Sequence, residues 1–571
     1  MGGLGRPARE PGRLPSGPSG ALRQIRVRLR SVRSLRAGMR AHPDRLGSAH
    51  GKRDPEVPVV PGRSHRPCAV PRRLAVRGAR GRAVEGGVPP EDVRTRDRGG
   101  VPRVQVGLGP GVADEPRQGR SGKVVRPHRM DENLRLGTDY RPPEVKVHFS
   151  YPEDHGSFAH ATNRCVGVGK CRHMGGGTMC PSFMATREEE HATRGRARIL
   201  FEMMSGKGEI ELWKSDEVRR ALDLCLSCKG CKKDCPVGVD MATYKAEFLS
   251  HYYRGKPRPR VAYAMGMIGR WASLGSRAPG LANFLLQTPG ISGALKRMAG
   301  IAPERAAPTF AHRTFRDWYG RRGSRAQPGS PHVLLWPDTF VNFFHPGVGK
   351  ATVEVLERAG YRVTLPKRAL CCGRPLYDYG MLDTAERWLH KILRTLRNDI
   401  RNGVTMIAME PSCLAVFRDE LPNLMPDDED AKRLSRQSVL LSEFLEGRRW
   451  EPPQLAGRKA VVQSHCHHKA VMGFESDQTM LERLGLDFEV LDSGCCGLAG
   501  SFGFEAGEKY DVSMKAGERV LFPKVRESSP DTLIVADGFS CRTQIEHGAG
   551  RRAVHLAEVV HMALRAEAVG R

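Results

Sequence analysis

The first 120 residues of this 571-residue chain lack most of what a folded domain needs. They contain no Phe, Tyr or Trp, although the whole chain has 36 such residues, of which Tyr140 is the first. Among their 26 basic residues only Lys52 is a lysine, and Gly and Pro fill 35 of the 120 positions. A segment of this composition cannot bury a core, so we predict that residues 1–120 are disordered or are not the natural reading frame.

Three origins for this segment stay open at the level of sequence. It could be a basic nucleic-acid arm, an Arg-rich transit peptide, or GC-rich DNA translated in the wrong frame. Codons for Val76–Gly119 read one base later permit a peptide with aromatics, lysines and a GEHGDG segment. That peptide resembles the carboxyl end of FAD-linked oxidases. We therefore favour a frame shift and expect no nucleic-acid partner.

The remaining chain has no run of 18 consecutive apolar residues, which argues against a membrane-spanning helix. It also lacks the cysteine density of a disulfide-stapled miniprotein, since the whole chain has 15 cysteines. The net charge of +29 is concentrated in residues 1–120, which hold 26 basic and 10 acidic residues. Bunched cysteines instead indicate metal ligation in a reducing compartment, so we expect a cytoplasmic location.

A ferredoxin-type cysteine run follows. Cys225, Cys228, Cys231 and Cys235 form the pattern C-x2-C-x2-C-x3-C-P that is typical of a [4Fe-4S] cluster. Three thiolates reach the iron corners from one tight turn, and we expect Pro236 to open a helix behind Cys235. Zinc ribbons usually separate two C-x2-C pairs by a longer gap, which makes zinc the weaker alternative.

A second run, Cys165-x5-Cys171-x8-Cys180-Pro181, precedes the first and has only three cysteines. In two-cluster ferredoxins the fourth cysteine of one run serves the other cluster. We therefore expect Cys180 to join Cys225, Cys228 and Cys231 around one [4Fe-4S] cluster. Cys165, Cys171 and Cys235 would then share a site that is short of one ligand. That site could hold a [3Fe-4S] cluster, use His173, or be empty. A helical stretch over 187–224 would span the two sites.

The C-terminal half contains a repeat with paired cysteines. The first unit has Cys371-Cys372-Gly373 and then Cys413, and the second has Cys495-Cys496-Gly497 and then Cys541. In both, a β-branched run (404–409 and 532–536) leads to the last cysteine, and helices are expected over 382–400 and 510–520. Alternating strands and helices predict α/β units with ligands at the strand ends.

The two units differ in one ligand. The second has Cys466, whereas the first has no cysteine at the matching place, around 339–342. Buried apolar thiols are the plain alternative, but two pairs with matched downstream cysteines favour a metal cluster. His465, His467 and His468 flank Cys466 and could ligate zinc instead. The segment 345–352 looks like a nucleotide loop but lacks the required Gly, so we expect an ordinary helix start.

These motifs carry a specific resemblance. The CCG-containing units resemble the cysteine-rich domain of heterodisulfide reductase B subunits. Together with the ferredoxin part they resemble the iron–sulfur subunits of glycolate oxidase and anaerobic glycerol-3-phosphate dehydrogenase. They are most similar to bacterial proteins that fuse an FAD-linked D-2-hydroxyacid oxidase to an iron–sulfur half. The resemblance covers about residues 122–571, and it implies an unusual iron–sulfur cluster at Cys466, Cys495, Cys496 and Cys541.

The predicted fold is α+β and multidomain. A disordered N-terminus precedes an α-helical two-cluster ferredoxin-like domain and duplicated α/β CCG units. The segment 257–330 is expected to be a helical linker, although it could also lie on a membrane surface or reach a quinone. The expected limits are 1–120, 121–256 for the ferredoxin-like domain, 257–330, 331–450 for the first CCG unit and 451–571 for the second.

No nucleophile–base or carboxylate pair suggests acid–base catalysis in residues 121–571. The resemblance implies an oxidoreductase component that transfers electrons from an FAD-linked dehydrogenase of lactate, glycolate or 2-hydroxyglutarate type to an acceptor such as quinone. FAD would sit on a partner or a missing upstream domain, and the isolated chain would be inactive. A heterodisulfide-reductase-like catalytic subunit and a zinc-stabilised binding module are the alternatives.

Overall fold

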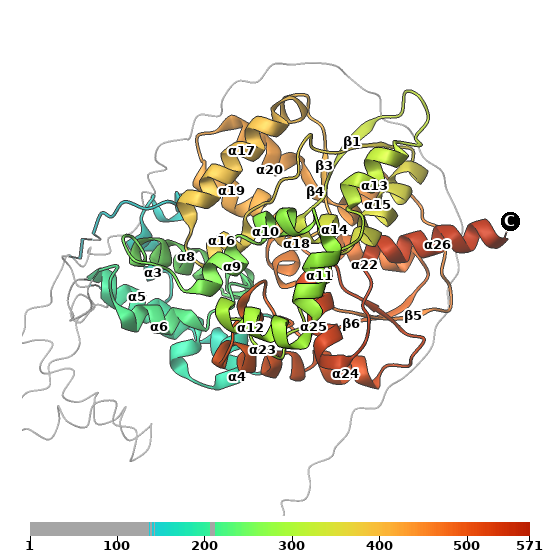
Figure 1. Ribbon diagram of the computed structural model, residues 1–571. Coiled ribbons are helices and arrows are strands. Elements are labelled where there is room, and N and C mark those ends of the chain that lie inside the picture. Colours follow the sequence, from blue (N-terminus) through green and yellow to red (C-terminus); the bar gives the residue numbers. More distant parts are fainter. Residues whose placement is uncertain (1–135, 137–139, 142, 206–211, 571) are drawn as a thin grey trace, which may run out of the picture. The chain divides into compact units, whose positions relative to one another are not determined.

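The computed structural model describes residues 136, 140–141, 143–205 and 212–570 of the chain. The predictions for residues 1–120 lie outside these residues. The described part belongs to one compact unit that begins at His128. It contains helices throughout and two small parallel sheets, so the predicted mixture of helical and α/β parts is confirmed (Figure 1).

Within the described residues of 152–252 the structure has short helices joined by loops and no strand. Cys180 caps α4, whose first residue is Pro181. The expected helix at Pro236 is wrong, because the chain turns after Cys235 through Gly238, which has a φ of +61°. The helices are η1 (Pro152–Asp154), α3 (Phe158–Asn163), η2 (Lys170–Arg172), α4 (Pro181–Thr186), η3 (Glu189–His191), α5 (Thr193–Ser205), α6 (Asp216–Asp223), α7 (Gly230–Asp234) and α8 (Met241–Tyr252).

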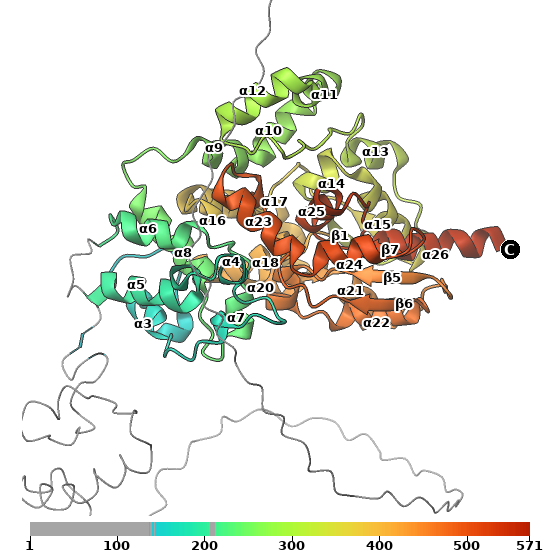
Figure 2. The ribbon, with the colours of Figure 1, turned by 90° about the horizontal axis from the view of Figure 1, so that it is seen from below.

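The next segment is a group of short helices. Pro279 and Pro289 start two of them at the first helical turn, where a missing N–H costs nothing. Figure 2 shows α10, α11 and α12 grouped together. The helices are α9 (Arg260–Gly266), α10 (Ile268–Gly275), α11 (Pro279–Gln287), α12 (Pro289–Ala299) and α13 (Phe315–Arg322).

The first sheet is four-stranded and parallel, in the order β2-β1-β3-β4. The strands are β1 (His332–Trp336), β2 (Arg362–Thr364), β3 (Met406–Ala408) and β4 (Ser438–Leu440). The long helix α17 (Leu382–Arg401) buries Leu389, Leu396 and Ile400, and it closely matches the helix expected over 382–400. The other helices are α14 (Thr339–Phe343), α15 (Pro346–Arg358), α16 (Arg374–Asp378), α18 (Pro411–Ala415), η4 (Val416–Glu420), α19 (Leu421–Leu424), α20 (Glu429–Gln437) and α21 (Leu441–Gly447).

The second sheet is three-stranded and parallel, in the order β6-β5-β7. Its strands are β5 (Lys459–Val462), β6 (Asp487–Val490) and β7 (Leu533–Val535). The β-branched runs 404–409 and 532–536, which were predicted to lead to the last cysteine of each unit, contain strands β3 and β7. The helices are η5 (His468–Met472), α22 (Glu475–Arg483), η6 (Phe502–Phe504), α23 (Glu508–Glu518), α24 (Leu521–Glu527), α25 (Phe539–Ala549) and α26 (Leu556–Gly570).

One hydrophobic core joins the two sheets. Val333 and Leu335 of β1 and Ala460 and Val462 of β5 belong to the same buried cluster, together with residues of α15 and α26. Burial on both faces explains why the central strands read as continuous apolar runs. The segment 345–352 contains the start of α15 at Pro346, as expected for an ordinary helix. None of the described helices is both long and apolar enough to cross a bilayer.

Candidate metal centres and the cavity beside them

Four cysteines of the ferredoxin-like part line one small cavity. They are Cys180, Cys225, Cys228 and Cys231, the set expected from the crossed ligand rule. Ser227 and Lys229 between them adopt positive φ angles of 52° and 57°, which wraps the turn tightly. Four thiolates around one enclosed space suit a [4Fe-4S] cluster.

Cationic groups surround this cysteine set. The Arg196 guanidinium donates to Cys180 Sγ at 3.5 Å, and Lys245 Nζ donates to the Cys225 carbonyl at 2.7 Å. Burial, and then the thiols of Cys466, Cys231 and Cys180, raise the pKa of Cys228 well above its ordinary value. Without metal the Cys228 thiol therefore stays protonated, whereas a bound metal ion displaces the proton.

The remaining ferredoxin cysteines lie nearer the surface. Cys171 is buried, whereas Cys165 and Cys235 are half-buried. Burial is the largest effect that raises the pKa of Cys171 to about 11, and the Cys165 and Cys180 thiols add to it. A side chain on Gly238, just after Cys235, would come within 3.2 Å of the guanidinium of Arg164. Gly238 and Arg164 are thus neighbours in the fold, while the alternative ligand His173 is exposed.

The four cysteines of the predicted second CCG unit form a linked and buried group. Cys495 hydrogen-bonds to both Cys466 and Cys496, and Cys496 hydrogen-bonds to Cys541. The hydrogen bond from Cys495 is the largest effect that lowers the pKa of Cys466 to about 7. Gly497 has a φ of +95°, and a Cβ there would lie 2.2 Å from a carbonyl oxygen of α23. Only glycine fits here, which accounts for the G of this CCG motif.

The first CCG unit brings together three cysteines. The Sγ atoms of Cys372 and Cys413 are 2.9 Å apart, and Cys371 hydrogen-bonds to Cys372. The Cys371 thiol also hydrogen-bonds to the hydroxyl of Thr339. The set thus offers three thiolates and neighbouring oxygen atoms.

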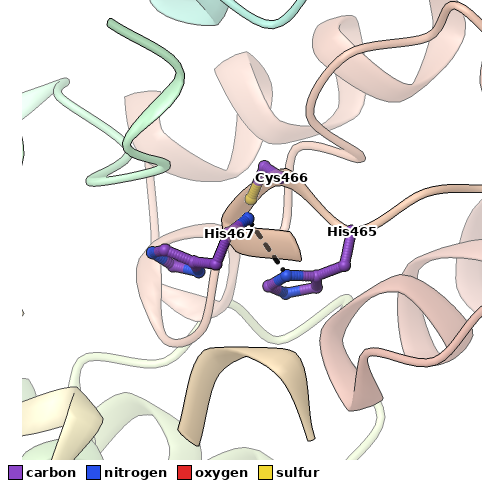
Figure 3. Close-up of side chains that lie close together, drawn as sticks. All are labelled: His465, Cys466 and His467. Carbon is purple, nitrogen blue, oxygen red and sulfur yellow. Dashed lines mark hydrogen bonds between the residues drawn. The ribbon is translucent and has the colours of Figure 1, made fainter. Parts of the chain in front are cut away.

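The rings of His465 and His467 lie side by side near Cys466, with their centroids 5.3 Å apart (Figure 3). His465 Nδ1 accepts a hydrogen bond from the His467 backbone N–H at 3.2 Å, and its Nε2 lies 4.0 Å from Glu410 Oε1. His467 Nε2 lies 3.0 Å from the Ser227 carbonyl, and its Nδ1 has no partner among the described residues. Ligand atoms of His465, Cys466 and His467 lie within 4.8 Å of one another, so the zinc alternative stays a hypothesis.

A cavity of about 680 Å³ lies beside both CCG sites. Apolar side chains of α9–α12 line it on one side, and Cys371, Cys372, Cys413 and Cys466 are among its lining residues on the other. The motifs in the sequence did not predict this cavity. A sequence signal was present, because no Asp or Glu occurs between Glu247 and Glu304, whereas eight Lys or Arg do.

A buried ion network connects the ferredoxin turn to the first CCG unit. Lys229 Nζ lies 2.7 Å from Asp419, 3.1 Å from Glu420 and 3.3 Å from Asp240. Burial alone would lower the pKa of Lys229, but these three carboxylates raise it well above its ordinary value. Lys232 contacts Asp419 as well.

Known protein families match the ferredoxin-like part and the first CCG unit of the chain separately. Residues 161–239 match the model of the 4Fe-4S dicluster domain, and residues 338–418 match that of the cysteine-rich CCG domain. The chain is 30% identical over 268 residues to one of the subunits of anaerobic glycerol-3-phosphate dehydrogenase from Escherichia coli K12, a match that covers 46% of this chain and 67% of the relative. It is 30% identical over 245 residues to lactate utilization protein A from Geobacillus thermodenitrificans, covering 40% of this chain and 98% of that protein.

A longer match extends across both parts. The chain is 25% identical over 442 residues to D-2-hydroxyglutarate dehydrogenase from Pseudomonas putida, covering 69% of this chain. The chain spans only 42% of that relative's length. The predicted domain limits stay predictions.

We predict that Lys229→Met lowers the free energy of unfolding by about 3 kcal/mol, because it leaves buried carboxylates short of one positive charge. Lys233→Met, which alters an exposed lysine of α7 just after Lys229, should change the free energy of unfolding by less than about 0.5 kcal/mol. Denaturant unfolding of both variants measures the difference. Equal stabilities would show that the network does not hold the two parts together.

Proposed function

The chain belongs to a family of iron–sulfur proteins with ferredoxin and CCG domains, and we propose that it transfers electrons for an FAD-linked D-2-hydroxyacid dehydrogenase. This family includes lactate utilization protein A and the matching subunit of anaerobic glycerol-3-phosphate dehydrogenase. The substrate would be lactate, glycolate or 2-hydroxyglutarate. The names of the relatives support this class of reaction. The observation that carries the proposal is the grouping of eleven cysteines into three buried or cavity-lining sets.

The proposed ligands fall into the sets that were expected. Cys180, Cys225, Cys228 and Cys231 would hold a [4Fe-4S] cluster, and Cys466, Cys495, Cys496 and Cys541 the cluster of the second CCG unit. Cys371, Cys372 and Cys413 would serve the first unit, and Cys165, Cys171 and Cys235 the second ferredoxin site. When bound, iron–sulfur clusters accept and release single electrons. We further infer that the two CCG units are copies of one ancestral unit, which their two parallel sheets support.

Contacts between the sets support a direction of transfer. Cys228 of the ferredoxin turn and Cys466 and Cys495 of the second CCG unit belong to one buried cluster. Between them, the Ser227 carbonyl accepts a hydrogen bond from His467. Electrons that enter from a flavin partner at the ferredoxin-like part would pass through its cysteine sets first. They would then reach the CCG sites and, last, the cavity.

An acceptor that fits the cavity is a quinone. The lining of the cavity is mostly apolar, with polar groups such as His465 and Ser540 on the side of the cysteines. Ligand pockets of about this volume with a few polar groups bind small, largely apolar molecules. The cavity thus supports a neutral ring-shaped acceptor over a charged one.

We also propose that the helices α9–α12 dock on the inner face of the membrane. Tyr263, Trp271, Leu281 and Phe284 on these helices are each more than 40% exposed. The eight basic residues in an acid-free stretch would attract anionic lipid headgroups. Docking here would let a lipid-soluble acceptor reach the cavity.

We expect the anaerobically purified chain to be brown and to contain iron and sulfide. Cys228→Ser should lower the iron content, because it removes a thiolate from the ferredoxin set, while Cys68→Ser should leave it unchanged. A D-2-hydroxyacid should not reduce a dye with this chain alone and should do so once an FAD-linked oxidase is added. A chain that contains zinc but no iron would favour the zinc-stabilised binding module. Dye reduction by the chain without any flavoprotein would contradict the proposal that the flavoprotein oxidises the substrate.

For the acceptor, we predict that Ile268→Trp slows quinone reduction by the dithionite-reduced protein at least tenfold, because the larger ring fills the cavity. Reduction of ferricyanide, a small charged oxidant, should keep its rate. Leu281→Trp, on the exposed face of α11, is the matched control and should alter neither rate. Stopped-flow absorbance measures all four combinations. Equal slowing of both oxidants by Ile268→Trp would place quinone reduction elsewhere.

For the membrane, we predict that the protein cosediments with vesicles containing phosphatidylglycerol and that the double change Trp271→Ser and Phe284→Ser weakens binding at least fivefold. Fewer exposed apolar rings would enter the interface. Val569→Ser removes an exposed apolar side chain from α26 and should not affect binding. If both variants bind like the unchanged protein, α9–α12 are not the docking surface.

A further inference from the structure

One histidine and two aspartates of the C-terminal part form a group that the proposed function does not use. His468 starts η5, Asp477 lies in α22, and Asp537 follows β7. One ligand atom from each of the three lies within 4.8 Å of the other two, and His468 Nδ1 is 3.7 Å from Asp477 Oδ2. His468 thus belongs to a different group from His465 and His467, and it is not among the residues that line the large cavity.

Two polar atoms of this group are buried without a partner. His468 Nδ1 and Asp477 Oδ1 form no hydrogen bond within the described part of the chain. His468 is only 1% exposed and Asp477 only 3% exposed. Burying such atoms costs free energy that nothing here repays, so each of them calls for a ligand.

The histidine nearest to the third member of the group brings no positive charge. Asp537 Oδ1 accepts the N–H of Leu556 at 2.8 Å and lies 3.4 Å from His555 Nδ1. The Nε2 of His555 donates to the carbonyl of Met409 at 2.9 Å, because a carbonyl can only accept. Its Nδ1 accepts the N–H of Ala557 at 3.0 Å. An imidazole that donates at one nitrogen and accepts at the other is neutral.

The basic side chains do not neutralise the two aspartates either. Among the described residues, no Lys or Arg forms an ion pair with Asp477 or Asp537. Arg418 pairs with both carboxylate oxygens of Glu443 at 2.8 Å, so its charge is already matched. Arg542 donates to the backbone carbonyl of Asp537 and not to its carboxylate. A divalent cation would supply the positive charge that these carboxylates lack.

We propose that His468, Asp477 and Asp537 bind one divalent cation at a site separate from the cysteine sets. One imidazole and two carboxylates form a mixed nitrogen and oxygen donor set, which suits Zn²⁺ or Mn²⁺. Ligands about 2.1 Å from such an ion lie roughly 3–4 Å from one another, so the three side chains need to close only slightly. Water would fill the remaining positions, as it does in zinc sites with three protein ligands.

The position of the cation would give it a structural role. His468 comes two residues after Cys466, and Asp537 comes four residues before Cys541. The ion would therefore tie the segment after β5 to the segment after β7 and hold these two cysteines at a fixed separation. This role rests on the proposed function, whereas the cation site itself does not.

The test uses the full chain, reconstituted anaerobically with iron and sulfide, and Mn²⁺ as the probe. Mn²⁺ prefers oxygen and nitrogen ligands to thiolates, so it separates this site from the cysteine sets. Electron paramagnetic resonance of free Mn²⁺ measures binding in a titration. We expect Asp477→Asn to weaken Mn²⁺ binding at least tenfold. Mn²⁺ should also raise the melting temperature of the unchanged chain, because it binds only the folded state, and should not raise that of Asp477→Asn.

A matched control and a second variant accompany this measurement. Asp487→Asn makes the same change at an exposed aspartate of β6 and should leave Mn²⁺ binding as it is. If Asp477→Asn does not fold, Asp537→Asn is measured in its place, because an amide oxygen can still accept the N–H of Leu556. It should weaken Mn²⁺ binding to the same extent.

Either of two results would overturn the proposal. A melting temperature of the unchanged chain that does not respond to Mn²⁺ would mean that the two carboxylates share a proton and hold no cation. Equal Mn²⁺ affinity in the unchanged chain and the variant would mean that Mn²⁺ binds elsewhere. The proposed function fails separately, because a chain that takes up no iron and still binds Mn²⁺ here refutes electron transfer and keeps the cation site.

Discussion

The relative positions of the cysteine sets depend on one three-residue turn, Ser227–Lys229. The carbonyl oxygen of Ser227 accepts hydrogen bonds from Arg374 at 3.2 Å and from His467 at 3.0 Å. Arg374 lies two residues after Cys372, and His467 is next to Cys466. A backbone carbonyl has two lone pairs, and here each serves a different CCG unit. The turn that carries the ferredoxin cysteines is therefore also the junction of the two α/β units.

The buried charges next to this turn balance one another. Lys229, Lys232 and Arg374 face the carboxylates of Asp240, Asp419 and Glu420. Such networks seldom add much stability over a well-packed apolar core, but breaking one is expensive because an unpaired buried charge remains. Misplacement of the ferredoxin turn by one residue would leave several charges unpaired. The network thus favours a single alignment of the two parts.

Prediction from the sequence succeeded where the chemistry is local and failed where it depends on tertiary contacts. Cysteine spacing led to the grouping of Cys180 with the run at 225–231, and the structure places these residues around one cavity. The expectation for Pro236 was wrong because Gly238 turns the chain there. The pairing of Lys229 with Asp419 joins residues 190 positions apart, and no pattern in the sequence indicates it. The cavity likewise arises only when α9–α12 pack against both sheets' cysteine loops.

In the proposed function, the distribution of charge would keep the two redox partners apart. A 2-hydroxyacid is an anion, and its oxidation would belong to a flavin partner. The cavity by contrast is apolar and borders the CCG cysteines, so an ionic substrate would lose hydration there without compensation. A neutral acceptor does not carry this cost. In the proposed function, the apolar cavity would select acceptors by desolvation with few specific contacts, and the cysteine sets between the two ends would fix the path of the electrons.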